Sequence, residues 1–380
     1  MILSCSKMDE YKKYVEGGEL TYPAKLDSIR VLSGRYRATI QGVVAVNKGL
    51  SSFRIFWNNR RDSVVVPVQL TENVDTLSYT ITNLPEGPMS FEVRSYDDKG
   101  NSSVPTFIVG NVYGERFRQS MVQRSMLASN FSAGYKASLS FQDVSKEMGV
   151  YGIRFKYTNR AYKQVDTVVQ TPNIDASVSL PNFLLGKEVQ YATVYKPDSV
   201  AIDTFMTPFV KMNLRGDVSD FLLKNFKMPF ATATFDGNRW GTLADWYTND
   251  AMKNHNGYGG FATDDGGTIH LEAGWGAPAL ENGKIYQKIS MPAGRYAFSA
   301  NVSWSTYNNN DAPAYLVFSK GDGIPDYDEV NSTTAVAFNK IGQNRFEFEL
   351  TEETELSVGL VVKMYPDNLL RITYFKLELL

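Results

Sequence analysis

The residues best suited to do chemistry in this chain are aromatic side chains that stand beside amides and carboxylates after about Gly216. Four of the five tryptophans lie in this stretch, together with both histidines. A sugar presents flat C–H faces ringed by hydroxyl groups, so a protein binds it with exposed aromatic rings beside side chains that hydrogen-bond the hydroxyls. We therefore expect a carbohydrate-binding surface in this stretch. The candidate contact residues are Trp246, Tyr247, Trp275, Tyr307, Asn308, Asp311 and Asn368.

These rings have a second interpretation, because large aromatic side chains in β-sandwiches are usually buried. We expect Trp240 and Trp304 in the core for this reason. Polar residues and glycines flank Trp246, Tyr247 and Trp275. For these three rings we therefore keep both alternatives, a place on a binding surface and a place in the core. The exposure of each ring decides between the two roles.

Patterns of the common enzyme classes are absent from the sequence. It contains no Gly-x-Ser-x-Gly elbow, phosphate-binding loop, His-Glu-x-x-His helix or Gly-x-Gly-x-x-Gly fingerprint. A single cysteine, Cys5, and two histidines exclude a disulfide framework and a Cys/His zinc cluster. We expect His255 at the surface rather than as a base, because no partner can be placed beside it. Among 41 acidic residues no carboxylate pair of a glycosidase can be singled out, so no enzyme activity is expected.

Calcium is the one cofactor that the acidic residues leave open. Carboxylate oxygens are its preferred ligands, and Asp264, Asp265 and Glu272 lie close together in the aromatic-rich stretch. We expect no other cofactor, and keep structural calcium at these three residues as an alternative.

The elements that position these residues are expected to be β-strands. The chain of 380 residues holds 22 phenylalanines and 22 tyrosines, which favour strands over helices. Hydrophobic residues make up 43%, which argues against disorder and is enough for sizeable cores. A formal charge of −2 gives no electrostatic reason to expect nucleic acid or an anionic membrane surface as a partner. The expected fold class is all-β.

The first part of the chain is predicted to hold two tandem sandwiches of the immunoglobulin or fibronectin type III kind. Short alternating runs separated by turn residues extend from Asp27 to Val109. The pattern returns about one hundred residues later, where Ile153–Arg160 aligns with Phe53–Arg60. We expect a tether at residues 1–20, the first sandwich at 21–113 and the second at 114–212.

Residues 213–380 are predicted to form a jelly-roll sandwich, because strand-like runs follow one another over this length. Alternation in one run places Tyr296, Phe298, Ala300 and Val302 on the core face and continues to Trp304. Loops from distant parts of a jelly roll meet at one end of the sandwich. The candidate contact residues are expected to meet in this way.

The N-terminus resembles the end of a bacterial lipoprotein signal. Ile2-Leu3-Ser4 precedes Cys5, whose thiol would take the lipid, although the basic and long apolar regions that should come before it are missing. Lys7 and Asp9-Glu10 resemble the charged tract that sends such proteins to the cell surface in Bacteroidetes. A chance cysteine near the end of a soluble chain is the alternative. The lipoprotein hypothesis places the protein on the outer membrane at the cell surface, attached through Cys5.

Three motifs carry a resemblance to a known family. Tyr22–Asp27, Trp57-Asn58-Asn59 and Asn83–Gly87 resemble the bacterial family called domain of unknown function 4998, and the remainder is similar to its frequent companion, domain of unknown function 5013. Tyr286–Phe298 resembles a strand, turn and strand of galactose-binding-like modules.

The resemblance implies a surface lipoprotein of a Bacteroidetes polysaccharide-utilisation system. Its expected partners are a glycan, the outer membrane through the lipid anchor, and other surface proteins of the uptake system, but no nucleic acid. Two alternatives stay open. The first is an interaction or adhesion protein at the cell surface without a sugar site, and the second, less favoured, is a glycan-active enzyme.

Overall fold

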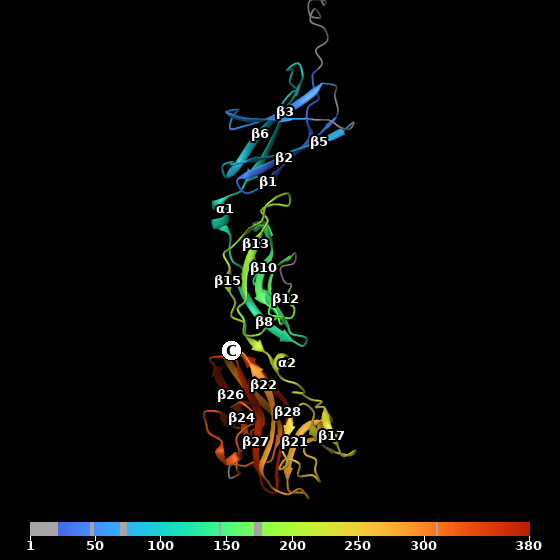
Figure 1. Ribbon diagram of the computed structural model, residues 1–380, viewed down its shortest axis with the longest axis vertical. Coiled ribbons are helices and arrows are strands. Elements are labelled where there is room, and N and C mark those ends of the chain that lie inside the picture. Colours follow the sequence, from blue (N-terminus) through green and yellow to red (C-terminus); the bar gives the residue numbers. More distant parts are fainter. Residues whose placement is uncertain (1–21, 46–48, 69–73, 144–145, 171–176, 309–310) are drawn as a thin grey trace, which may run out of the picture. The chain divides into compact units, whose positions relative to one another are not determined.

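The computed structural model describes residues 22–45, 49–68, 74–143, 146–170, 177–308 and 311–380 (Figure 1). Strands dominate these residues, and the α-helices α1 (Glu115–Ser120) and α2 (Ser219–Leu222) are short. No helix in these ranges is both long enough and apolar enough to cross a membrane. The all-β prediction is confirmed. The predicted tether at 1–20 and the lipid attachment at Cys5 lie outside the described residues.

The described residues fall into two compact units. The first comprises the residues up to Gln123 with 146–152 and 192–208, and the second comprises 124–143, 153–191 and 209–380.

The N-terminal sandwich belongs to the first unit and has two antiparallel sheets. One has the strand order β1-β2-β5 and the other β4-β3-β6-β7. The strands are β1 (Asp27–Ser33), β2 (Arg37–Ala45), β3 (Leu50–Trp57), β4 (Asp62–Pro67), β5 (Val74–Thr82), β6 (Gly87–Asp97) and β7 (Thr106–Val112). Alternate residues fill the space between the sheets, and Ile40, Phe53, Ile55 and Phe91 are fully buried there.

The middle of the chain holds a three-stranded sheet, in the order β12-β9-β8, and a five-stranded sheet. The second has the order β11-β10-β13-β14, with β15 paired to β13. The strands are β8 (Met126–Ser132), β9 (Lys136–Phe141), β10 (Val150–Thr158), β11 (Gln164–Gln170), β12 (Val178–Leu180), β13 (Gln190–Tyr195), β14 (Phe205–Met206) and β15 (Val210–Lys211). Leu139, Phe155, Leu180 and Phe183 are buried here, in the core of the second unit.

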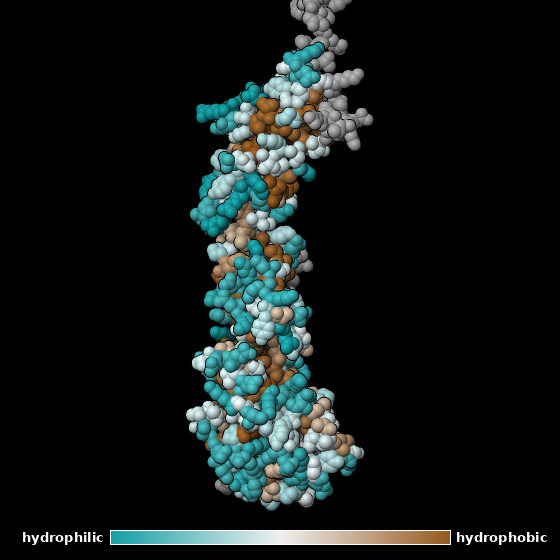
Figure 2. Space-filling view, viewed as in Figure 1, coloured by the Kyte–Doolittle hydropathy of each residue, from teal (hydrophilic) through white to brown (hydrophobic). Residues whose placement is uncertain are grey.

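The C-terminal sandwich, also in the second unit, has a larger and a smaller sheet. The larger follows the order β17-β18-β20-β21-β28-β23-β26, with β16 paired to β28, and the smaller follows β19-β22-β27-β24-β25. Strands of the larger sheet are β16 (Gly216–Asp217), β17 (Thr232–Phe235), β18 (Trp240–Leu243), β20 (Gly260–Ala262), β21 (Thr268–Ala273), β23 (Gly294–Ser305), β26 (Gly342–Leu350) and β28 (Asn368–Leu379). Those of the smaller are β19 (Tyr247–Thr248), β22 (Leu280–Met291), β24 (Tyr315–Lys320), β25 (Ala335–Ala337) and β27 (Thr354–Met364). The visible surface of this sandwich is mainly hydrophilic, as expected when the apolar faces of both sheets are turned inward (Figure 2).

The predicted alternation along β23 is confirmed for four residues and fails at the fifth. Tyr296, Phe298, Ala300 and Val302 are buried, but Trp304 is 55% exposed. The pairing of β23 with β28 shifts register between Val302 and Trp304, so that one extra residue is inserted in β23. Such a bulge moves the following side chain to the opposite face of the sheet. The prediction that Trp304 lies in the core is therefore wrong.

Replacing Phe298 and Trp304 separately by alanine tests this assignment. We expect Phe298→Ala to lower the free energy of unfolding by about 3–5 kcal/mol, because it leaves a cavity between the sheets. Trp304→Ala should cost less than about 1 kcal/mol, because the ring lies on the outer face. Urea denaturation of both variants measures the difference. An equally large loss in the two variants would place Trp304 in the core after all.

Candidate functional site

A row of side chains crosses the outer face of the larger sheet in the C-terminal sandwich. The register pairs His270 of β21 with Arg371 of β28, and Arg371 with Trp304 of β23. Their chain neighbours Ile269 and Ile372 are buried between the sheets. Because successive strand residues point to opposite faces, the row lies on the outer face.

Arg371 is held in this row by two adjacent carboxylates. Its Nη1 lies 2.9 Å from Oδ2 of Asp265, and its Nη2 lies 3.1 Å from Oδ1 of Asp264. Arg239 donates from Nε to Oδ2 of Asp264 at 2.9 Å. Burial works against the charged form of Asp264, yet the hydrogen bond from Arg239 and the positive charges of Arg239 and Arg371 hold the pKa of that carboxyl below its usual range. The network fixes the position of the Arg371 guanidinium.

A buried histidine and glutamate lie beneath this network. Nε2 of His270 is 3.0 Å from Oε2 of Glu272, and both side chains are almost fully buried. Burial raises the pKa of Glu272, with Arg239 opposing the shift, and lowers the pKa of His270 to about 4. His270 is therefore neutral at pH 7.

Trp240 and His255 pack beside His270, the first residue of the row. Their rings stack with centroids 3.5 Å apart, and the Arg239 guanidinium lies 4.3 Å from the Trp240 centroid. We predicted Trp240 in the core, but it is only half-buried and lies on the outer face. The prediction of a surface position for His255 is also wrong, because its side chain is 12% exposed and its Nε2 lies 3.9 Å from Oε1 of Glu272. Within the described residues this Nε2 is buried without a hydrogen-bond partner.

Three loops that carry predicted contact residues meet at one end of this sandwich. The N–H of Asp367 donates to the carbonyl of Ala273 at 2.9 Å, beside the turn that holds Trp275. The hydroxyl of Thr306 donates to the carbonyl of Asp367 at 2.7 Å. These bonds bring Trp275, residues 306–308 and residues 365–368 together. Trp275 itself is 61% exposed and has a left-handed backbone, with φ of 51°.

The other contact residues predicted in these loops differ in how far their side chains are exposed. Tyr307 is half-buried, its hydroxyl donates to the carbonyl of Lys363 at 3.4 Å, and burial raises its pKa. The N–H of Asn308 donates to Oδ2 of Asp311 at 2.6 Å, at an exposed corner. Asn368 is 3% exposed, and its Oδ1 accepts the N–H of Tyr365 to close a turn. The prediction that Asn368 contacts a ligand is therefore wrong, because its side chain is used within the loop.

Trp246 and Tyr247 do not join the loop cluster. Trp246 is 6% exposed, donates from Nε1 to the carbonyl of Asn225 at 2.9 Å, and packs on Phe375 at 4.7 Å. It is a core residue, so its prediction as an exposed platform is wrong. Tyr247 is 56% exposed, but it packs on Tyr286 and belongs to the smaller sheet.

We name Trp275, Trp304, Arg371, Asp265 and Asn308 the two-tryptophan site. Two exposed indoles, a fixed guanidinium and an exposed carboxylate or amide supply the flat apolar faces and hydrogen-bonding groups that hydroxyl-rich ligands require. Trp304 and Arg371 were not predicted as contact residues from the sequence, because only the bulge in β23 puts the two side chains on one face.

The acidic residues considered for calcium are engaged otherwise. Asp264 and Asp265 contact Arg371, and Glu272 contacts His270. In the ranges that the structure describes, no three His, Cys, Asp or Glu side chains are grouped so that they could hold a metal ion.

The buried histidines make stability depend on pH. The folded-state pKa values of His255 and His270 are both about 4, below the ordinary 6.5, so the unfolded chain binds more protons between about pH 6.5 and 4. We expect the free energy of unfolding to fall as pH falls through this window, by up to about 1.4 kcal/mol per pH unit for each histidine. The raised pKa of Glu272 acts in the opposite direction above pH 4.5 and offsets part of the slope.

Urea denaturation followed by tryptophan fluorescence at pH 7, 6, 5 and 4.5 measures this dependence, because four of the five tryptophans lie in the second unit. His255→Gln and His270→Gln should each flatten the slope. An unchanged slope in both variants would contradict the prediction.

Comparison with known proteins connects this architecture to two families. The DUF4998 family, a domain of unknown function, matches residues 5–205, and DUF5013, also a domain of unknown function, matches residues 224–359. No curated protein sequence matches the chain. The two families in tandem, with their β-sandwich fold, fit a surface protein.

Several solved structures resemble parts of the chain at low identity. The crystal structure of chicken CNTN1 FN1–FN3 domains is 12% identical, with a TM-score of 0.33, over 52% of this chain and 69% of that chain. A segment of two fibronectin type III domains from chicken tenascin is 10% identical, with a TM-score of 0.20, over 50% and 98%. Dimeric latent PorU from Porphyromonas gingivalis is 10% identical, with a TM-score of 0.20, over 54% and 21%. At this level of similarity they indicate no shared activity.

The motifs Trp57-Asn58-Asn59 and Asn83–Gly87 predicted the first of these families, and the match to it spans more than half of the chain. The chain therefore belongs to the DUF4998 family and carries a DUF5013 domain in tandem.

Proposed function

We propose that the C-terminal sandwich binds a glycan through the two-tryptophan site, without catalysing a reaction. The observation that carries the proposal is the exposure of Trp275 and Trp304 on segments that hydrogen bonds hold together. Exposed large aromatic rings beside fixed polar groups are typical of binding sites, whereas sandwich tryptophans are otherwise mostly buried.

The chemistry of binding follows from the arrangement. Each indole offers a flat face on which the C–H side of a sugar ring can stack. Arg371 supplies N–H donors, and the carboxylate of Asp265 supplies an acceptor for sugar hydroxyls. Because Arg371 is already held by Asp264 and Asp265, little side-chain freedom is lost on binding. A single shallow site of this kind gives a dissociation constant on the order of micromolar to millimolar.

We further propose that the protein is a lipoprotein of the outer membrane, exposed at the cell surface and attached through Cys5. The lipoprotein-like residues around Cys5 and the tandem of domain families support this placement. Such a protein would present a glycan to other surface proteins of a polysaccharide-utilisation system.

Alanine variants at the two exposed indoles test the glycan site. We expect Trp275→Ala and Trp304→Ala in the full chain to weaken binding about tenfold each, which corresponds to about 1.4 kcal/mol. Affinity electrophoresis against a panel of neutral and acidic polysaccharides detects the ligand, and calorimetry measures the affinity.

Tyr247→Ala is the matched control, because this ring is equally exposed but lies on the smaller sheet. Its binding should equal that of the unchanged protein. A polysaccharide that binds all three variants equally well would rule out the two-tryptophan site.

Labelling with a lipid precursor in the native host tests the anchor. We expect the label on the protein expressed from its own gene and its loss in Cys5→Ala, because the thiol is the group that takes the lipid. Label that persists in Cys5→Ala would refute the anchor at this residue.

A further inference from the structure

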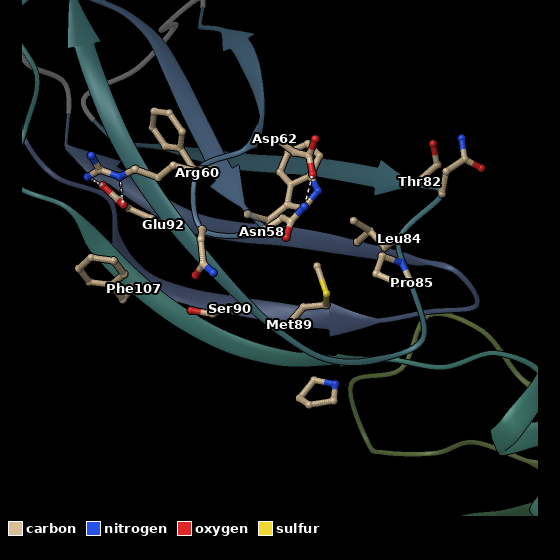
Figure 3. Close-up of a pocket in the computed structure, with 15 residues that line it drawn as sticks. Asn58, Arg60, Asp62, Thr82, Leu84, Pro85, Met89, Ser90, Glu92 and Phe107 are labelled. Atoms are coloured by element: carbon tan, nitrogen blue, oxygen red, sulfur yellow. Dashed lines mark hydrogen bonds and ion pairs between the residues drawn. The ribbon is translucent and has the colours of Figure 1, made fainter.

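Two motifs from separate parts of the sequence meet around a hollow in the N-terminal sandwich. Trp57-Asn58-Asn59 ends β3 and turns the chain toward β4, and Asn83-Leu84-Pro85 connects β5 to β6. Both motifs line a hollow of about 750 Å³ (Figure 3). This volume lies in the range of pockets that hold small ligands. The two-tryptophan site uses neither motif.

Amide side chains from both motifs line the hollow. Asn58, Asn59 and Asn83 have left-handed backbones with φ of 51°, 53° and 58°, a conformation that asparagine tolerates better than most residues. All three side chains are exposed. An amide offers one acceptor and two donor hydrogens, so it can bond hydroxyl groups in either direction.

Polar and apolar side chains both line the hollow, and the apolar ones include Trp57, Leu84, Pro85 and Met89. Trp57 continues the alternation of Phe53 and Ile55, which are buried on the inner face of β3. Because Trp57 is the last residue of the strand, its side chain is only half-buried. Figure 3 shows Leu84, Pro85 and Met89 gathered on one side of the hollow. Apolar side chains beside exposed amides repeat the combination that sugar rings require.

The charged groups of the hollow are already paired. Arg60, the single basic side chain among the described lining residues, donates from Nε to Oε2 of Glu92 at 2.7 Å, and Arg94 donates to Oε1 of Glu92 at 2.6 Å. The hydrogen bond from Arg60 is the main reason that the pKa of Glu92 lies below its usual range. The amide of Asn58 donates to Asp62 at 3.0 Å. With its one cation engaged and Asp62 among its lining residues, the hollow favours a neutral ligand over an anionic one.

We propose that this hollow is a second carbohydrate site, which binds a segment of a neutral sugar chain. Trp57 stacks against a sugar ring, and Asn59 and Asn83 bond its hydroxyls. The ligand class rests on the proposed function, while the site itself belongs to the other unit of the chain. Two sites on one chain increase the apparent affinity for a polysaccharide that reaches both, because the second contact becomes intramolecular.

The test uses the full chain with Trp275→Ala and Trp304→Ala, which removes the two-tryptophan site. ¹⁵N-tryptophan labelling reports on each remaining indole, and Trp57→Phe identifies the signal of Trp57. The probes are neutral gluco-, manno-, galacto- and xylo-oligosaccharides of three to six residues, with oligogalacturonate as the acidic comparison. We expect a neutral oligosaccharide to shift the Trp57 signal with saturation and the acidic one to leave it unchanged.

Glycine variants separate loss of binding from loss of folding. Asn59→Gly and Asn83→Gly keep the left-handed backbone but remove the amide, so we expect a folded protein whose affinity falls at least tenfold. Asn182→Gly is the matched control, because Asn182 is exposed with φ of 52° in the second unit. This variant should bind as well as its parent.

The outcomes distinguish the two sites. A shift that survives Asn59→Gly and Asn83→Gly, or no shift with any neutral oligosaccharide, overturns the second site. If the glycine variants lose binding while Trp275→Ala and Trp304→Ala change nothing, the second site stands and the proposed function of the C-terminal sandwich fails.

Discussion

The outer face of the C-terminal sandwich depends on the irregular pairing of β23 with β28. Regular alternation would send Trp304 inward beside Val302, into the closely packed space between the sheets. The bulge before Trp304 turns the ring outward and sets it opposite Arg371. The strands β23 and β28 therefore form part of both the core and the candidate site. They bury aromatic residues over most of their length and expose Trp304 near the end of β23.

The polar layer beneath the site has a second role. His270 and Glu272 lie on the outer face of the sheet but are nearly inaccessible, since Arg239, Arg371 and the stacked pair of Trp240 and His255 cover them. Burying such groups is costly unless they bond one another. The layer fixes the arginines above it, so the site is held by a network rather than by loops alone.

Much of this architecture could be predicted from the sequence, and the errors have physical causes. Alternation identified Tyr296 and Phe298 as core residues, because side-chain direction in a regular strand follows from position alone. Trp304 escaped this rule because a bulge depends on the neighbouring strand.

His255 was misplaced because its hairpin is fixed by Asn254, which donates to the carbonyls of Glu272 and Pro278, far along the chain. Local polarity around Trp246 suggested exposure, but the carbonyl of Asn225 satisfies its indole inside the core.

The pairing of Arg371 with two neighbouring carboxylates affects how the site responds to its surroundings. A guanidinium balanced in this way offers directed hydrogen bonds without an excess of positive charge. Attraction that depends on net charge weakens as salt rises, whereas short-range stacking and hydrogen bonding are little screened. Under the proposed function, a surface site built like this would select its ligand by shape and hydroxyl pattern, and would keep that selectivity where ionic strength fluctuates.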